Sequence, residues 1–225
     1  MLGTKIGPVD AALARYTELV SGASANAVLD LAVSGKIPVG CGINASLEYA
    51  VQSGRKVLTV EKDATAVLLK LGCDGCDMGV GKVSCGLTYL NASGDDAATA
   101  DKNEDYSGVN PSLKLTEIVS DRASGKKTDD DAYNTAIANR NAIVLNLGLA
   151  PAAVAGLNLG LAYGTYKANE GTEKNLATEL NLTAGYKVSD AVSLSLLLAQ
   201  MDPDKGLTSY TDKATKIQAG MKIVF

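Results

Sequence analysis

Apolar and polar residues alternate with a period of two along most of this chain. The pattern is clearest at residues 214–225. Its apolar side carries Ile217, Ala219, Met221, Ile223 and Phe225. Its polar side carries Lys216, Gln218, Gly220 and Lys222. Because successive side chains of a strand point to opposite faces, the pattern predicts a β-strand with one apolar and one polar face.

The same alternation predicts further strands upstream, which we place at residues 9–20, 26–34, 39–51, 65–72, 81–90, 142–150, 157–166, 175–188 and 192–200. Residues 9–20 also fit an amphipathic helix, but the neighbouring segments favour a strand. The total is about ten strands, most of them about 9 to 13 residues long. Strands of soluble proteins have about 5 to 6 residues, whereas a tilted strand needs roughly 9–11 residues to cross a bilayer.

The links between these strands are alternately short and long. The short links are residues 34–38, 73–81, 149–156 and 188–192, and the long, charged links are residues 52–63, 91–140, 167–174 and 201–215. Outer-membrane barrels have short turns on one side and long loops on the other, whereas the crossovers of a soluble β-sandwich do not follow this order. The sequence therefore predicts an all-β, antiparallel up-and-down transmembrane β-barrel, with residues 1–225 as one domain and residues 91–140 as its long extracellular loop.

In such a barrel the polar face of each strand encloses water and the apolar face meets lipid. The expected pore-lining residues are Asp30, Asn44, Glu48, Lys70, Lys82, Asn146, Asn158, Glu179, Asn181, Lys187, Lys216, Gln218 and Lys222. Aromatic residues gather at the membrane interfaces. The expected ones are Tyr49, Tyr89 and Tyr163 on the outer side and Tyr186 and Phe225 on the periplasmic side.

Composition excludes several classes of function. The chain has a net charge of −4, so it lacks the basic excess that nucleic-acid binding requires. It contains no His, which excludes Ser–His and His-based acid–base catalysis. Glu48 and Glu179 could form a carboxylate pair, but nothing in the sequence brings them together. We expect neither an enzyme nor a cofactor.

The four cysteines, Cys41, Cys73, Cys76 and Cys85, are expected near the periplasmic rim. The spacing of Cys73 and Cys76 resembles a redox or metal motif, but Cys41 and Cys85 do not supply a second ligand pair. One or two structural disulfides are the favoured use in an oxidising compartment, and a bond between Cys73 and Cys76 would only tighten a turn. No metal site is expected.

The long loop contains acidic clusters at residues 95–96, 101, 104–105 and 129–131. They could bind Ca²⁺, but their spacing is not that of an EF-hand, so a solvated acidic loop is the default interpretation. Residues 112–121 are amphipathic within otherwise polar sequence. We expect them to fold into the lumen as a constriction.

Two segments resemble known proteins. The terminal strand, ending in Phe225, is similar to the signature by which bacterial outer-membrane proteins engage the barrel-assembly machinery. A strand containing Tyr89 that leads into Ser93, Gly94, Asp95 and Asp96, followed by Tyr106, resembles the alginate-export-like porins of Gram-negative bacteria. Members of that family are longer and carry a signal peptide. Residues 3–10 read as a strand end followed by a turn, so we expect this chain to be the carboxy-terminal portion of a larger barrel.

The resemblance implies an outer-membrane channel in contact with lipids and lipopolysaccharide. Because the expected lumen charges are mixed, selectivity for alginate is not expected. The predicted function is passive diffusion of small hydrophilic solutes or ions through the barrel. The alternatives are a small structural or adhesive barrel without conduction and, further away, a soluble β-sandwich.

Overall fold

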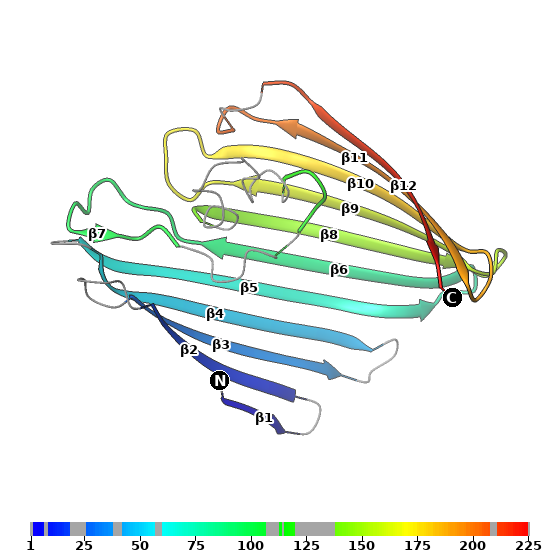
Figure 1. The fold of residues 1–225 in the computed structure, drawn as a ribbon, viewed down its shortest axis with the longest axis horizontal. Helices are drawn as coiled ribbons and strands as arrows, with labels where there is room; N and C mark the ends of the chain where they lie inside the picture. Colours follow the sequence, from blue (N-terminus) through cyan, green and yellow to red (C-terminus); the bar gives the residue numbers. More distant parts are fainter. Residues whose placement is uncertain are drawn as a thin grey trace.

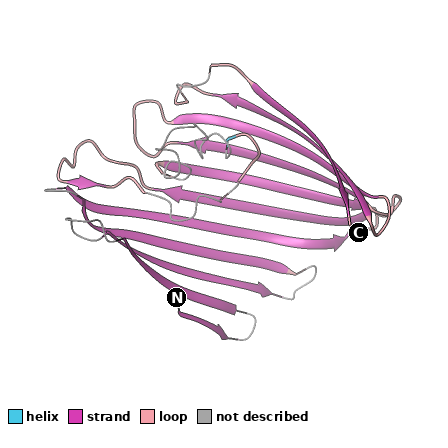
Figure 2. Ribbon diagram, viewed as in Figure 1, coloured by secondary structure: helices cyan, strands magenta, loops and turns pink. Residues whose placement is uncertain are grey.

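The computed structural model describes residues 2–6, 9–18, 26–37, 42–56, 60–106, 113, 115–119, 138–207 and 211–224. These residues form a single antiparallel sheet in the order of the chain, as Figures 1 and 2 show. Its strands are β1 (Leu2–Ile6), β2 (Val9–Glu18), β3 (Asn26–Ile37), β4 (Ile43–Lys56), β5 (Val60–Asp77), β6 (Gly81–Ala92), β8 (Arg140–Pro151), β9 (Leu157–Lys167), β10 (Asn175–Lys187), β11 (Val192–Pro203) and β12 (Ala214–Ile223). The two-residue β7 (Lys102–Asn103) pairs in parallel with β5. The predicted up-and-down barrel fold is confirmed.

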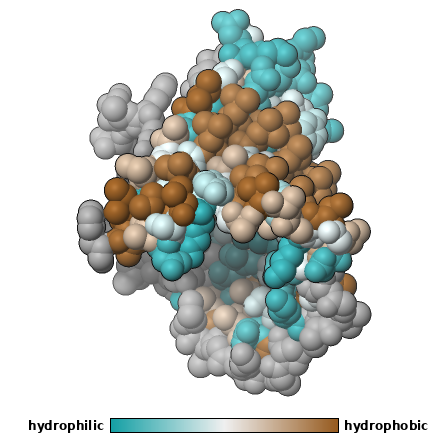
Figure 3. All heavy atoms as spheres, turned by 90° about the vertical axis from the view of Figure 1, so that its right-hand side faces the viewer, coloured by the Kyte–Doolittle hydropathy of each residue, from teal (hydrophilic) through white to brown (hydrophobic). Residues whose placement is uncertain are grey.

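The two faces of the sheet differ in the way that the alternation predicts. We call the face against which Tyr106 and Leu115–Val119 pack the inner face, and the opposite face the outer face. Large apolar side chains are exposed on the outer face, for example Leu47, Leu71, Leu145, Leu147, Leu180, Leu182, Leu196 and Leu198. Seen from the short-turn end, Figure 3 shows hydrophobic residues along the wall and hydrophilic residues in the hollow beside it.

Several strand boundaries differ from the prediction. The segment 52–63, expected as a long loop, is mostly strand, because β4 continues to Lys56 and β5 begins at Val60. β5 also runs through Cys73 and Cys76 to Asp77, where a turn was expected. A register shift between Cys73 and Cys76 accommodates the extra residues. Charged and small residues therefore extend these strands instead of ending them.

The sheet is open among the described residues. β1 pairs only with β2, and β12 pairs only with β11. A barrel that closed on itself would pair its last strand with its first, and among the described residues β12 does not pair with β1. Figure 1 shows the two edge strands on opposite sides of the curved sheet. Among these residues no helix is long and apolar enough to cross a membrane.

Candidate pore lining and its inner segments

The residues predicted to line a pore all lie on the strands, at positions that alternate with the exposed apolar residues of the outer face. Their shared face follows from the strand register. Asn146, for example, is opposite Ala162, which is opposite Asn181, which is opposite Ala199. The structure places this set on the inner face, and its role in lining a pore stays a prediction.

A bent segment from the long loop packs against this inner face. Its described part is Leu115–Val119, within the stretch expected to fold inward. Glu179, on β10, is 1% exposed and accepts four hydrogen bonds from the segment. Thr116 Oγ1 and the backbone N–H groups of Glu117 and Ile118 donate at 2.8 Å, and the N–H of Val119 donates at 2.6 Å. Converging donors of this kind stabilise a buried carboxylate, so Glu179 holds the segment to the wall.

Two further polar contacts extend this attachment. Thr116 Oγ1 lies 2.6 Å from the hydroxyl of Tyr166, on β9. Because Thr116 donates its proton to Glu179, the Tyr166 hydroxyl is the donor of this second bond. On the other side, Lys216 Nζ of β12 lies 3.1 Å from Glu117 Oε2. The segment thus contacts β9, β10 and β12 across the interior.

Apolar side chains also attach the segment to the wall. They make part of the inner face apolar, which the sequence did not indicate. Ile118 and Val119 are 5% and 4% exposed and belong to a cluster with inner residues of the wall. These wall residues include Leu90, Ala142, Val144, Tyr166, Leu176, Leu197 and Met201. Near the long-loop ends of β6 and β8–β11, the inner face is therefore an apolar core and not a uniformly polar lining.

A second inner segment covers the amino-terminal half of the sheet. Tyr106 is 4% exposed and packs over four alanines of β4, β5 and β6, namely Ala50, Ala64, Ala66 and Ala92. Its backbone N–H donates to the carbonyl of Ser93 at 3.0 Å. Burial raises the pKa of the Tyr106 phenol to about 12, and the nearby carboxylates of Asp30 and Glu48 act in the same direction.

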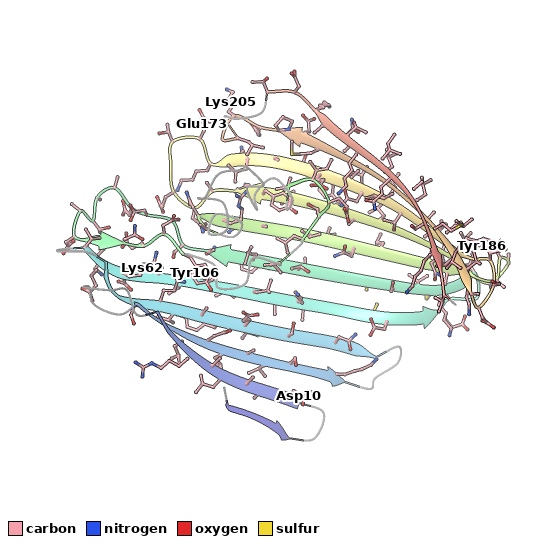
Figure 4. All side chains as sticks on the ribbon, viewed as in Figure 1. Asp10, Lys62, Tyr106, Glu173, Tyr186 and Lys205 are labelled. Atoms are coloured by element: carbon pink, nitrogen blue, oxygen red, sulfur yellow. The ribbon has the colours of Figure 1, made fainter. Side chains whose placement is uncertain are left out.

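The chain between Ser93 and Tyr106 is held by side chains at both ends. Lys62 Nζ donates to Asn103 Oδ1 at 2.7 Å and also to the carbonyl of Asp105. Ser93 Oγ donates to the carbonyl of Glu104 at 2.6 Å and accepts from the N–H of Thr65. Figure 4 shows Lys62 and Tyr106 together near the long-loop ends of the strands.

The acidic residues of this loop serve its own backbone. Asp95 accepts from the N–H of Glu104, and Asp96 accepts from the N–H of Ala98. Glu104 in turn accepts from Thr99 Oγ1 at 2.6 Å. No group of three potential ligands that could hold a metal ion occurs among the described residues.

Below the segment Leu115–Val119, the inner face is hollow. One hollow of about 490 Å³ is lined by polar residues that include Asn158, Thr183, Ser195 and Gln218, with Glu117 above them. A second hollow of about 290 Å³ shares Glu117, Gly160 and Thr183 with the first and adds Asn146 and Asn181. Six of the residues predicted to line a pore thus lie around one connected space or at the attachment above it: Asn146, Asn158, Glu179, Asn181, Lys216 and Gln218.

The other predicted lining residues lie elsewhere on the inner face. Asn44 and Lys70 line a hollow of about 600 Å³ at the short-turn side of β2–β5. Asp30 and Glu48 lie near Tyr106. Lys82, Lys187 and Lys222 lie toward the short turns, where Lys187 pairs with Asp190 at 2.6 Å. Glu48 and Glu179 lie on separate strands, β4 and β10, and form no catalytic pair.

The cysteines agree with the prediction of a structural disulfide but not with every pairing that was considered. Cys76 is disulfide-bonded, whereas Cys73 and Cys85 are free thiols, so the considered pairing of Cys73 with Cys76 is wrong. Cys73 and Cys85 are direct register partners on β5 and β6. Cys41 lies outside the described residues.

The predicted interface aromatics lie on the outer face where they are described. Tyr49, Tyr163 and Tyr186 are 41%, 41% and 43% exposed, while Tyr89 is partly buried. Tyr186 lies at the short-turn end of β10, as Figure 4 shows. Tyr49 lies near the middle of β4, not near its end. Phe225 lies outside the described residues, and the function of these rings stays a prediction.

Comparison with known proteins gives a structural match without a sequence match. No protein-family model matches the chain, and no curated protein is similar to it at a significant level. The chain is similar to the crystal structure of OccK11 (OpdR), an outer-membrane porin of Pseudomonas aeruginosa, with a TM-score of 0.53 and 13% identity. The match covers 98% of this chain and 68% of that one. At this identity the likeness establishes the porin-like barrel fold, and it does not single out the alginate-export-like family.

Proposed function

We propose that this protein is an outer-membrane porin through which small hydrophilic solutes or ions diffuse passively. The observation that carries the proposal is the opposite character of the two faces of the same strands. The outer face exposes leucines such as Leu147 and Leu196, at 54% and 52%. The inner face carries amides, hydroxyls and paired charges around open hollows. Such a wall is stable between hydrocarbon and water.

The attachment of Leu115–Val119 supports a selective rather than a wide channel. A loop segment fixed to the inner face narrows the aqueous path and sets which groups a solute meets. Glu117 and Lys216 lie at this level and neutralise each other. Discrimination by hydrogen bonding and size, without strong preference for either sign of charge, is the expected behaviour. No catalytic activity is proposed.

The two edge strands of a membrane-spanning sheet also need hydrogen-bonding partners. An unpaired strand edge exposes backbone N–H and C=O groups, which hydrocarbon cannot satisfy. Since β1 and β12 each have one partner among the described residues, we propose that further strands complete the barrel.

The decisive experiment is conductance in planar lipid bilayers after refolding in detergent. A porin gives stepwise increases of current in potassium chloride, and these steps persist in a range of small ions. The alternative, a structural or adhesive barrel, predicts a heat-resistant folded band on a gel together with no current steps. A protein that stays folded and monodisperse in buffer without detergent would contradict both.

A further inference from the structure

The connected hollow beneath Leu115–Val119 has the features of a built binding site. We define the amide site as Asn146, Asn158, Asn181, Thr183, Ser195 and Gln218, from β8 to β12. Its two parts, of about 490 and 290 Å³, lie in the range of small-ligand pockets. The site lies on the inner face, directly below the segment that Glu179 holds.

One buried group in this site has no partner among the described residues. Asn181 is 4% exposed, and no residue of the described part of the chain forms a hydrogen bond with its Oδ1. A buried acceptor without a donor costs about 1–3 kcal/mol, and such groups are rare in native proteins. Asn181 is also one of the residues that line the smaller hollow, so a donor bound in that hollow lies next to its side chain. A hydroxyl group of a bound solute is a suitable donor.

Glycines make room for the hydroxyl groups of the wall. A Cβ atom at Gly160 would lie 2.4 Å from Thr183 Oγ1, and one at Gly220 would lie 2.7 Å from Ser195 Oγ. Both distances are too short for any side chain. The two hydroxyls therefore lie close to the neighbouring strand, which leaves the hollow free above them.

The charge of the site defines the class of solute. Its six members are uncharged, and each can both donate and accept a hydrogen bond. The charged groups at its upper rim, Glu117 and Lys216, are paired with each other at 3.1 Å. A charged solute would have to enter without a free counter-charge, which is costly in a partly desolvated space. An uncharged solute with many hydroxyl groups can bind in the site without the cost of desolvating a charge.

We propose that the amide site binds an uncharged polyhydroxylated solute of the size of a monosaccharide or disaccharide. This inference rests on the proposed function, because it makes the site a stage on the path through the channel. It adds a substrate class that neither the fold nor the likeness to a known structure supplies.

The test compares three probes with one carbon skeleton and different charges: D-glucose, gluconate and glucosamine. Each is added to single channels in potassium chloride, and the reduction of current is measured against concentration. D-Glucose is expected to reduce the current saturably, and the two charged probes to give no saturable reduction. An equal or stronger saturable effect of either charged probe would overturn the assignment, as would a D-glucose effect that never saturates.

Substitutions in the amide site test whether D-glucose reduces the current by binding there. Asn181→Leu is expected to raise the half-blocking concentration of D-glucose about tenfold, the effect of removing one hydrogen bond to a buried group. Gln218→Leu, at an exposed position of the same site, provides a second variant should the first fail to fold. Gln200→Leu makes the same type of change at an exposed position of the outer face and is expected to leave the half-blocking concentration unchanged. An unchanged value in both site variants would contradict the inference.

A chain without conductance would contradict the proposed function but leave the amide site testable. Isothermal titration calorimetry of D-glucose against the detergent-folded protein measures binding directly. Saturable heat that Asn181→Leu abolishes supports the site in that case, and no heat of binding overturns it.

Discussion

At the scale of single residues, the neighbours that a side chain packs against decide its burial and its pKa more than the residue type does. Tyr106 is one of nine tyrosines, and it packs against a patch of four alanines on the inner face. The sequence marked Tyr106 only through a resemblance, because its alanine partners are dispersed over three strands. Ala50 and Ala66 lie within strands that the alternation predicted, whereas Ala64 and Ala92 lie just beyond the predicted strand ends.

The phenol of Tyr106 gives the first prediction. Its pKa of about 12 in the folded protein lies above the ordinary value of 10.0. The neutral form is favoured by folding, so its contribution to stability is complete below pH 10 and is lost as the pH rises toward 12. The phenolate absorbance of the wild type minus that of Tyr106→Phe is expected to develop near pH 12. A midpoint near pH 10, with the sheet intact by circular dichroism, would contradict the buried placement.

Cys73 and Cys85 give a second prediction at this scale. They are direct cross-strand partners, and both are free thiols. An added oxidant such as copper phenanthroline accepts two electrons from the thiols, whose protons go to the solvent, and a disulfide between β5 and β6 forms. Mass spectrometry of unreduced peptides is expected to detect this link in the wild type. Cys73→Ser is the control, and it should keep Cys85 open to maleimide with or without oxidant.

At the scale of elements, the strands were predictable and their extent and partners were less so. Alternation is a local signal, so it located most of the strands, including β2 (Val9–Glu18) within the ambiguous residues 9–20. It failed where strands continue into charged sequence, as in β4 up to Lys56. The contacts of Glu179 with Thr116–Val119 bridge about sixty positions, and no periodicity reports such distant pairs.

The attachment of Leu115–Val119 gives a prediction at this scale. Glu179→Gln keeps the size of the side chain but removes the charge that strengthens its hydrogen bonds, each worth roughly 1.5–3 kcal/mol with a charged partner. Release of the segment from the wall is expected to increase single-channel conductance and the noise of the open state. Glu173→Gln, the same change at an exposed loop position, is the control and should leave both unchanged. Equal conductance of wild type and Glu179→Gln would show that the segment does not narrow the path.

At the scale of the whole molecule, the central claim is that hydrocarbon surrounds the outer face and water the inner one. The sequence of a single strand shows neither whether the sheet closes into a barrel nor which solvent surrounds each face. Both depend on the partners of all the edges and faces of the sheet. The open edges at β1 and β12 are the clearest example. A sheet with these exposed leucines would aggregate in water, whereas in lipid the same leucines are favourably placed.

A pair of arginine substitutions at equal depth separates the two faces. Leu196 of β11 is opposite Ala219 of β12, and the next pair is Leu197 with Gln218, so Leu196 and Gln218 lie at nearly the same height on opposite faces. Leu196→Arg places a charge toward lipid and is expected to destabilise the folded protein in vesicles by about 2–4 kcal/mol. Gln218→Arg places the same charge toward the aqueous interior and is expected to change stability by less than about 1 kcal/mol. The free energy of unfolding of each variant is measured by urea titration. Unfolding is followed by circular dichroism or by the mobility of unheated samples on a gel. Equal destabilisation by the two arginines would mean that the faces share one environment, and the assignment of lipid to one and water to the other would then be wrong.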